Sequence, residues 1–153
     1  MAEPLREKIM AGLLLRLKDI KTVNGYLYTL QTCERRQADL PDFPITPAVF
    51  LYEGGEDKKN DGTRVLCELE VVVVFCVESL QDQGTVANRM LSDVSKAVGS
   101  DFIVSDADSL NRSVNISEVG TDVVIGETTN QLVYVSTTFT IFYYHQHGDH
   151  TRG

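Results

Sequence analysis

The stretch RVLCELEVVVVFCV, residues 64–77, decides the fold of this chain, because it reads as a single long β-strand. Alternate side chains along it are apolar and would share one buried face: Val65, Cys67, Leu69, Val71, Val73, Phe75 and Val77. The opposite face begins with Leu66, Glu68 and Glu70 and continues with Val72, Val74 and Cys76. The second half of the strand is therefore apolar on both faces, and we expect it to need cover from a helix or a neighbouring subunit.

The residues that precede this strand predict its hairpin partner. Ala48 to Tyr52 has the apolar and aromatic composition of a strand, and Asn60-Asp61-Gly62 suits a turn back into the long strand. Between them, residues 53–63 are mostly polar and include three glycines. We expect an extended loop at the tip of the hairpin, whose charged residues contact a partner protein: Glu53, Glu56, Asp57, Lys58 and Lys59.

Helical and strand patterns alternate through the rest of the chain. Apolar residues at helical spacing predict a first helix over residues 4–20 and a second one that begins near Asp82 or Thr85 and stops at Gly99. Short strands are expected at residues 26–30, near residues 114–116 and at residues 123–125, and a long strand at residues 131–144. This order predicts an α+β fold in which two principal helices pack on one face of a mainly antiparallel or mixed sheet.

Composition limits the classes of protein to consider. The chain of 153 residues is 42% hydrophobic, which fits one domain that buries about two-thirds of its unfolded surface. It carries 14 basic and 22 acidic residues, a net charge of −8, which opposes wrapping of nucleic acid. The first helix mixes Arg6, Glu7 and Lys8 with its leucines, so we expect neither a signal peptide nor a membrane span. Three cysteines without an obvious pairing fit a reducing cytoplasm.

The C-terminal residues resemble a metal-binding motif. His145, His147, Asp149 and His150 match the His-x-His-x-Asp-His pattern of the metallo-β-lactamase family. That family completes its site with ligands further downstream, and only residues 151–153 follow here. We therefore expect no metal and no other cofactor, and we predict that residues 146–153 form a flexible His-rich tail. The alternative is a small metal-dependent hydrolase that uses these histidines.

Arg35 and Arg36 form a basic pair in a predicted loop. Solvated charge is the ordinary interpretation of such a pair, and contact with an acidic protein or with passing DNA is the functional alternative. The chain contains no nucleophile elbow, phosphate-binding loop or dinucleotide fingerprint. We therefore predict that the protein is not an enzyme.

The order of elements resembles the tail terminator proteins of long-tailed bacteriophages, with the lambda-type minor tail protein as the nearest relative that we can suggest. The resemblance rests on a leading amphipathic helix, an arginine-bearing loop, the stretch PAVFLYEGGE at residues 47–56, the long strand, a capped helix and a final strand that ends in Phe142-Tyr143-Tyr144. It covers most of residues 5–145.

The resemblance implies a subunit of a hexameric ring in the virion, assembled in the host cytoplasm. Such a ring ends polymerisation of the tail tube and joins the head–tail connector, so the tube protein and the connector or stopper protein are the expected partners. DNA would only pass through the lumen, where Arg35 and Arg36 are candidate contacts. Val72, Val74 and Cys76 are the expected subunit interface. A head-completion or neck connector protein of the same particle is the alternative.

Overall fold

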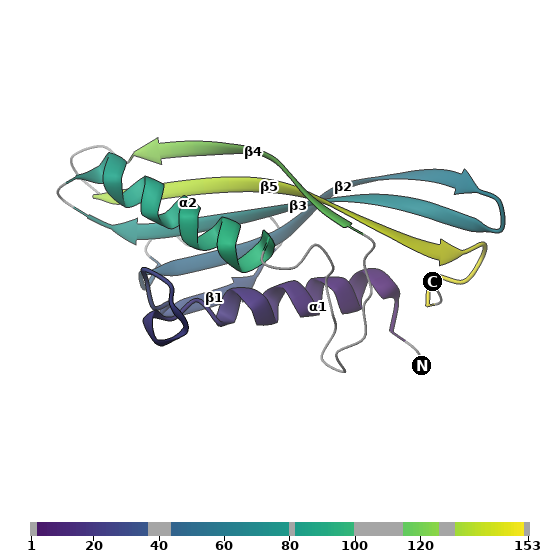
Figure 1. Cartoon of the computed structure of the whole chain (residues 1–153), viewed down its shortest axis with the longest axis horizontal. Coiled ribbons are helices and arrows are strands. Elements are labelled where there is room, and N and C mark those ends of the chain that lie inside the picture. The colour runs from purple at the N-terminus through teal and green to yellow at the C-terminus, as the bar shows by residue number, and fades with distance from the viewer. Residues whose placement is uncertain (1–2, 37–43, 80–81, 100–114, 126–130, 152–153) are drawn as a thin grey trace.

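The computed structural model describes residues 3–36, 44–79, 82–99, 115–125 and 131–151. Its helical elements are α1 (Leu5–Lys18), the short 3-10 helix η1 (Thr22–Asn24) and α2 (Gln83–Gly99). Its strands are β1 (Thr32–Arg35), β2 (Ala48–Asp61), β3 (Arg64–Glu78), β4 (Asn115–Ile125) and β5 (Leu132–Gln146). The helices α1 and α2 lie against the sheet (Figure 1), so the predicted α+β class is confirmed.

The five strands form one sheet in the order β1-β2-β3-β5-β4. β1 and β2 run parallel, and all other neighbours run antiparallel. The long strand at the centre, β3, pairs along almost its whole length with both β2 and β5. The mixed, mainly antiparallel sheet that the sequence predicts is therefore confirmed.

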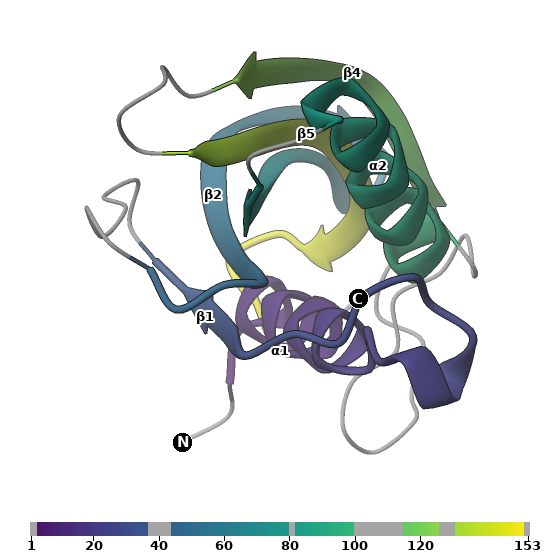
Figure 2. The same cartoon turned by 90° about the vertical axis from the view of Figure 1, so that its left-hand side faces the viewer.

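Both helices cover the same face of the sheet, as predicted, and the sheet curves around them (Figure 2). The apolar face of β3 meets buried residues of α1 and α2 in the main core, together with alternate residues of β5. Phe75 is fully buried there and makes an edge-to-face contact with Tyr28, with ring centroids 5.6 Å apart. Burial of large apolar side chains from every layer makes this core the main source of stability.

The short strand predicted at residues 26–30 is wrong, because β1 begins only at Thr32. Asp93 of α2 explains the difference. Its carboxylate accepts hydrogen bonds from the backbone N–H groups of Leu27 and Tyr28, at 2.9–3.1 Å. These N–H groups are therefore held by a side chain and do not join a sheet.

The second apolar face of β3 is covered within the single chain. Val72, Val74 and Cys76 are only 8%, 5% and 0% exposed. They form a separate cluster with Ala48, Phe50 and Leu132, against which Tyr52 and Tyr134 pack. The expectation that this face needs a helix or a neighbouring subunit as cover is therefore wrong, because it is buried among side chains of the same sheet. A subunit interface at these three residues remains a prediction, without the exposed surface that motivated it.

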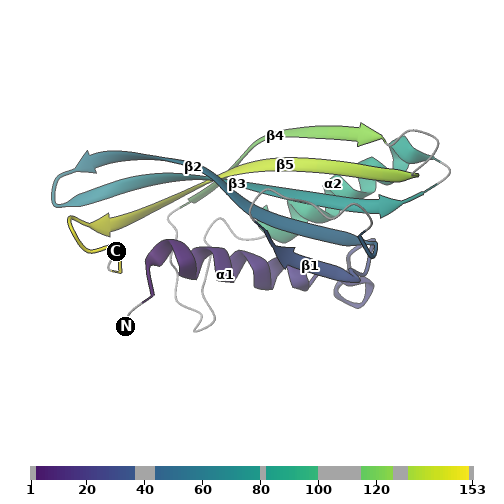
Figure 3. The same cartoon turned by 180° about the vertical axis from the view of Figure 1, so that it is seen from behind.

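The predicted loop at the hairpin tip is also wrong, because β2 continues as a strand paired with β3 to Asp61. The turn is limited to Gly62 and Thr63, and Gly62 has a φ of +62°, which suits glycine. Residues 56–61 of β2, 64–69 of β3 and 141–146 of β5 form a three-stranded extension, which we call the ribbon. Figure 3 shows the ribbon projecting past the helices.

None of the described helices is both long enough and apolar enough to cross a membrane.

Candidate functional site

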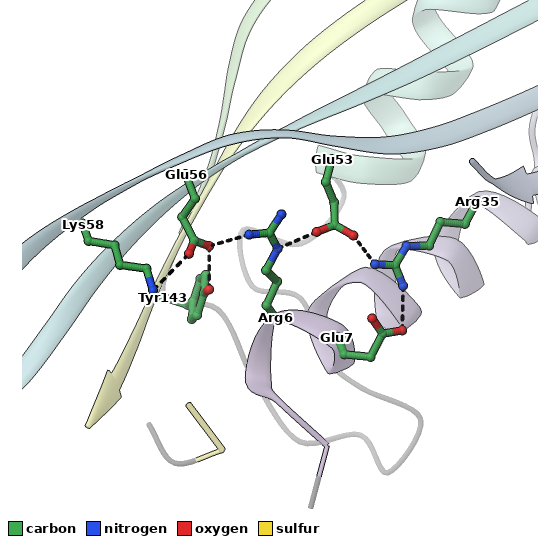
Figure 4. A network of polar contacts seen from close by, with 7 residues as sticks. All are labelled: Arg6, Glu7, Arg35, Glu53, Glu56, Lys58 and Tyr143. Atoms are coloured by element: carbon green, nitrogen blue, oxygen red, sulfur yellow. Dashed lines mark hydrogen bonds and ion pairs between the residues drawn. The ribbon is translucent and has the colours of Figure 1, made fainter. Parts of the chain in front are cut away.

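A chain of charged contacts joins the start of α1 to β2 at the base of the ribbon (Figure 4). Arg6 of α1 binds Glu53, with Nε and Oε2 2.5 Å apart. Arg35 of β1 also binds Glu53 and reaches Glu7 at 2.6 Å. We call the whole set the polar network: Arg6, Glu7, Arg35, Glu53, Glu56, Lys58 and Tyr143.

A β-bulge in β2 places both glutamates of the polar network on the same side. Side chains three positions apart on a regular strand point to opposite faces. Glu53 lies opposite Val71 and Glu56 lies opposite Leu69, so β2 has one extra residue over this interval. Both carboxylates therefore face α1.

Gly54 permits the close approach at this bulge. A Cβ atom added there would lie 2.8 Å from the Glu70 carboxylate. A larger residue at this position would require the exposed Glu70 side chain to move.

Glu53 and Arg35 of the polar network stabilise each other's charge. Burial raises the pKa of Glu53, but hydrogen bonds and charges from Arg35 and Arg6 outweigh it and hold this pKa below its usual range. Burial opposes the charge on Arg35, but Glu7 and Glu53 raise its pKa overall. Burial and the neighbouring Glu56 raise the pKa of Tyr143, so its hydroxyl stays protonated and donates to Glu56 at 2.6 Å.

The two arginines that were candidate DNA or partner contacts have partners within the chain. Arg35 is held by the polar network. Arg36 lies over the ring of Phe50, 5.5 Å from its centroid, and pairs with Glu34 at 3.1 Å. Each arginine therefore pairs with a carboxylate of its own chain. Contact between either arginine and DNA in a ring lumen stays a prediction.

The structure separates the five charged residues predicted as a partner-contact loop. Glu53 and Glu56 lie at the base of the ribbon, inside the polar network. Asp57, Lys58 and Lys59 are exposed on strand β2. Lys59 pairs with Glu68 at 3.2 Å, on the face opposite to α1. Only the last three residues of the set are therefore available to a partner.

A cleft of about 300 Å³ lies beside the polar network, lined by Pro4, Arg6, Glu56, Lys58, Tyr143, His145 and His150. His145 and His150 stack, with ring centroids 4.2 Å apart and ring planes 21° from parallel. Of the other two metal candidates, His147 is exposed, and Asp149 accepts from the Thr151 backbone N–H at 3.0 Å. Across the residues that the structure describes, no group of three His, Cys, Asp or Glu side chains could hold a metal ion.

The predicted flexible tail folds back onto the body as far as it is described. The carbonyl oxygen of His150 accepts from the backbone N–H of Leu5 at 2.9 Å, which ties the turn at residues 147–151 to the start of α1. Gln146 and Asp149 form an isolated β-bridge within this turn. Sequence reasoning missed this contact because it joins the two ends of the chain.

Two sheet edges are the surfaces that sequence reasoning missed. β4 is the last strand on its side of the sheet, and Val119, Val123 and Val124 are exposed on it. On the other side, β1 pairs only with Ala48–Leu51 of β2. In the described part of the chain, the outer edge of β2 beyond this point faces no other strand. Unpaired N–H and C=O groups on such edges can pair with another chain.

No protein-family model matches the chain, and no curated protein matches it. A search of solved structures finds a chain in a structure described as the virion of a native gene transfer agent particle, with a TM-score of 0.57 and 14% sequence identity. The match covers 92% of this chain and 98% of that chain. At this level of identity the likeness establishes the fold, and this chain therefore shares its fold with a component of a gene transfer agent virion.

Proposed function

We propose that this protein is a structural protein of a phage-like virion, and that it serves as a tail terminator. In this role it forms a ring, expected to be a hexamer, at the head-proximal end of the tail tube, ends tube polymerisation and provides the surface that joins the head. The observation that carries the proposal is the likeness to a virion chain over nearly the full length of both proteins. The order of elements along the sequence gives independent support.

The two free sheet edges support assembly into a ring. The β4 edge carries three exposed valines, whereas the β2 edge along the ribbon carries charged residues of both signs. Because the edges differ, copies of the chain would join edge to edge in a head-to-tail manner, and such contacts close into a ring when the rotation between copies allows it. The contact that we propose therefore joins β4 of one copy to β2 of the next.

The ribbon is the proposed contact with a neighbouring ring, either the tube or the connector. It projects past the helices and presents Asp57, Lys58 and Lys59 on paired strands (Figure 3). A paired strand loses less conformational entropy on binding than a free loop, so the ribbon is better suited to a specific contact than the loop that the sequence predicts.

The net charge of −8 fits a ring through which DNA passes. Acidic surfaces repel phosphates, so an acidic lumen would not hold the DNA during ejection. The proposal accordingly assigns no stable DNA complex to this protein.

Electron microscopy of the particle, combined with native mass spectrometry of the free protein, tests the proposal. We expect a ring of this chain between the tail tube and the connector, and tails of uncontrolled length when the gene is removed. A ring on the head side of the connector would instead assign the head-completion role. Particles that lack the chain altogether would refute both roles.

A further inference from the structure

The two free sheet edges offer segments of equal length. In β4 the pairing with β5 shifts by one residue just before Gly120, so a bulge leaves residues 120–125 as the regular end of this edge. In β2 the pairing with β3 shifts just before Glu56, so the regular part of the ribbon edge is residues 56–61. Each edge therefore presents an unbroken segment of six residues to another strand.

The strand order determines how these two segments can meet. β2, β3, β5 and β4 are successive neighbours in the sheet, and each of these pairs runs antiparallel. β4 therefore runs opposite to β2. When copies of the chain join edge to edge with their helices on the same side, β4 of one copy lies antiparallel to β2 of the next.

The charged side chains on the sheet face away from the helices distinguish the possible registers. On the ribbon edge this face carries Asp57, Lys59 and Asp61, one basic residue between two acidic ones, and all three are exposed. On the regular end of β4 the same face carries the exposed Asp122, which lies opposite Ser136 of β5. An acidic residue on one edge can therefore meet either sign of charge on the other edge, depending on the register.

Only one of the three central registers brings opposite charges together. Alignment of the two six-residue segments end to end places Lys59 opposite Asp122. A slip of two residues, the smallest that keeps every side chain on its own face, would place Asp57 or Asp61 there instead. Opposite charges on directly opposed residues stabilise a strand pair, and like charges destabilise it. Segment length and charge therefore favour the same register.

We propose that residues 120–125 of one copy pair antiparallel with residues 56–61 of the next copy, with Asp122 opposite Lys59. The proposal rests on the ring of the tail terminator role and specifies which residues of neighbouring subunits meet. The backbone pairs supply most of the contact, as in other cases of strand addition at a sheet edge, and the charged pair selects the register.

The neighbouring side chains are compatible with this register. The Lys59 side chain is 68% exposed, and its surface contact with Glu68 contributes little that would oppose a new partner. On the helix side of the sheet, Lys58 would lie opposite Val123, which is 44% exposed in the single chain. The methylene groups of a lysine can cover such a valine while the ammonium group stays in water.

A charge exchange tests the pair. Lys59→Glu and Asp122→Lys should each raise the concentration needed for ring assembly about tenfold, because each variant places like charges opposite one another. The double variant should restore assembly, because it reverses the pair. Lys58→Glu combined with Asp122→Lys is the matched control and should not restore it, because Lys58 lies on the other face.

Native mass spectrometry of the full chain measures assembly, and electron microscopy scores the same variants in particles, so the test does not require the free chain to form rings. Failure of the Lys59 and Asp122 exchange to restore assembly would overturn the pair. The same failure is expected if Lys59 acts only on a neighbouring ring.

Cysteine pairs test the register directly. Asn60→Cys and Thr121→Cys lie directly opposite one another in the proposed register, within disulfide distance between copies. Asn60→Cys with Val123→Cys is the control, because these positions are opposite only after a slip of two residues. We expect oxidation to link copies of the first variant and not of the second. The single-cysteine variants account for links made through the natural cysteines, of which Cys33 is half-buried.

The outcomes separate this inference from the tail terminator role. A ring in the particle without charge rescue, or with stronger linking of the Asn60 and Val123 pair, overturns the proposed register and leaves the role standing. Particles without a ring of this chain would overturn both.

Discussion

Asp93 illustrates how one carboxylate can organise a segment far away in the sequence. It is 2% exposed and receives the backbone N–H groups of Leu27 and Tyr28, which follow α1 and η1. Removing it leaves two N–H groups without their acceptor in a partly buried site. We expect Asp93→Ala to lower the free energy of unfolding by about 2–3 kcal/mol.

Urea unfolding at one protein concentration measures this change. Ser92→Ala is the matched control, because Ser92 is exposed on the same helix, and it should change stability by less than about 0.5 kcal/mol. Equal stability of the Asp93 variant and the natural chain would show that the three hydrogen bonds contribute nothing net.

Glu53 is expected to make stability depend on pH. Its pKa is lower in the folded chain than in the unfolded one, so its stabilisation is present above the unfolded value of about 4.3 and is lost as pH falls through the folded value. Glu53→Gln removes this contribution, and because Arg6 and Arg35 are partly exposed we expect a loss of only about 1 kcal/mol at pH 7.

Unfolding experiments at pH 7 and at about pH 3 distinguish the effect of Glu53 from general acid destabilisation. The difference between the natural chain and Glu53→Gln should shrink at the lower pH. Glu34→Gln serves as the control, because Glu34 is exposed and outside the polar network. A difference that is the same at both pH values would contradict a lowered pKa.

At the scale of elements, the β4 edge carries the proposed contact between copies. Val124 is 59% exposed on this strand, so a charged side chain there meets water in the single chain. Lysine on an edge strand opposes pairing with another edge. Val124→Lys should therefore prevent ring formation while changing the stability of the single chain by less than about 0.5 kcal/mol.

Native mass spectrometry and an assembly assay measure the effect of Val124→Lys. Val23→Lys is the control, because Val23 is 86% exposed on η1, which belongs to neither sheet edge. Rings of Val124→Lys with normal mass would place the interface elsewhere, and Val72, Val74 and Cys76 would then be tested next.

The ribbon carries the proposed contact with a neighbouring ring. Lys59→Glu reverses a charge that is 68% exposed and whose pairing with Glu68 contributes little to stability. We expect the variant to fold normally but to join tails to heads about tenfold less often, because the reversed charge no longer complements the surface that the lysine would meet. Lys21→Glu, at an exposed position outside the ribbon, is the control. Normal joining by the Lys59 variant would remove this face of the ribbon from the contact.

Across the whole molecule, sequence patterns predict the elements better than their contacts. Alternation along residues 64–77 and helical spacing in residues 4–20 are local signals, so β3, α1 and the α+β class follow from them. The ribbon was missed because charged residues in 53–61 suggest a loop, although paired strands with solvated faces tolerate them equally well.

The candidate sites depend on contacts between distant residues, which local patterns do not contain. The polar network needs a bulge at Glu53 and Glu56 and a helix start beside it. The cover over Val72 comes from β2 and β5 residues whose positions depend on the register of the whole sheet. Among the cleft residues, the sequence singles out His145 and His150 for a metal role that the described residues do not support, and Glu56 and Lys58 as part of an expected partner-contact loop.

The hydrogen bond between Leu5 and His150 brings the described ends of the chain together beside the ribbon (Figure 1). A fluorescent or electron-dense marker fused to either end would therefore report the same corner of the molecule, and two such fusions would act as an internal check on orientation in images of particles. The same proximity allows a short linker to join the ends while new termini are opened at an exposed turn such as Gly62, so the order of segments can be rearranged without moving the sheet.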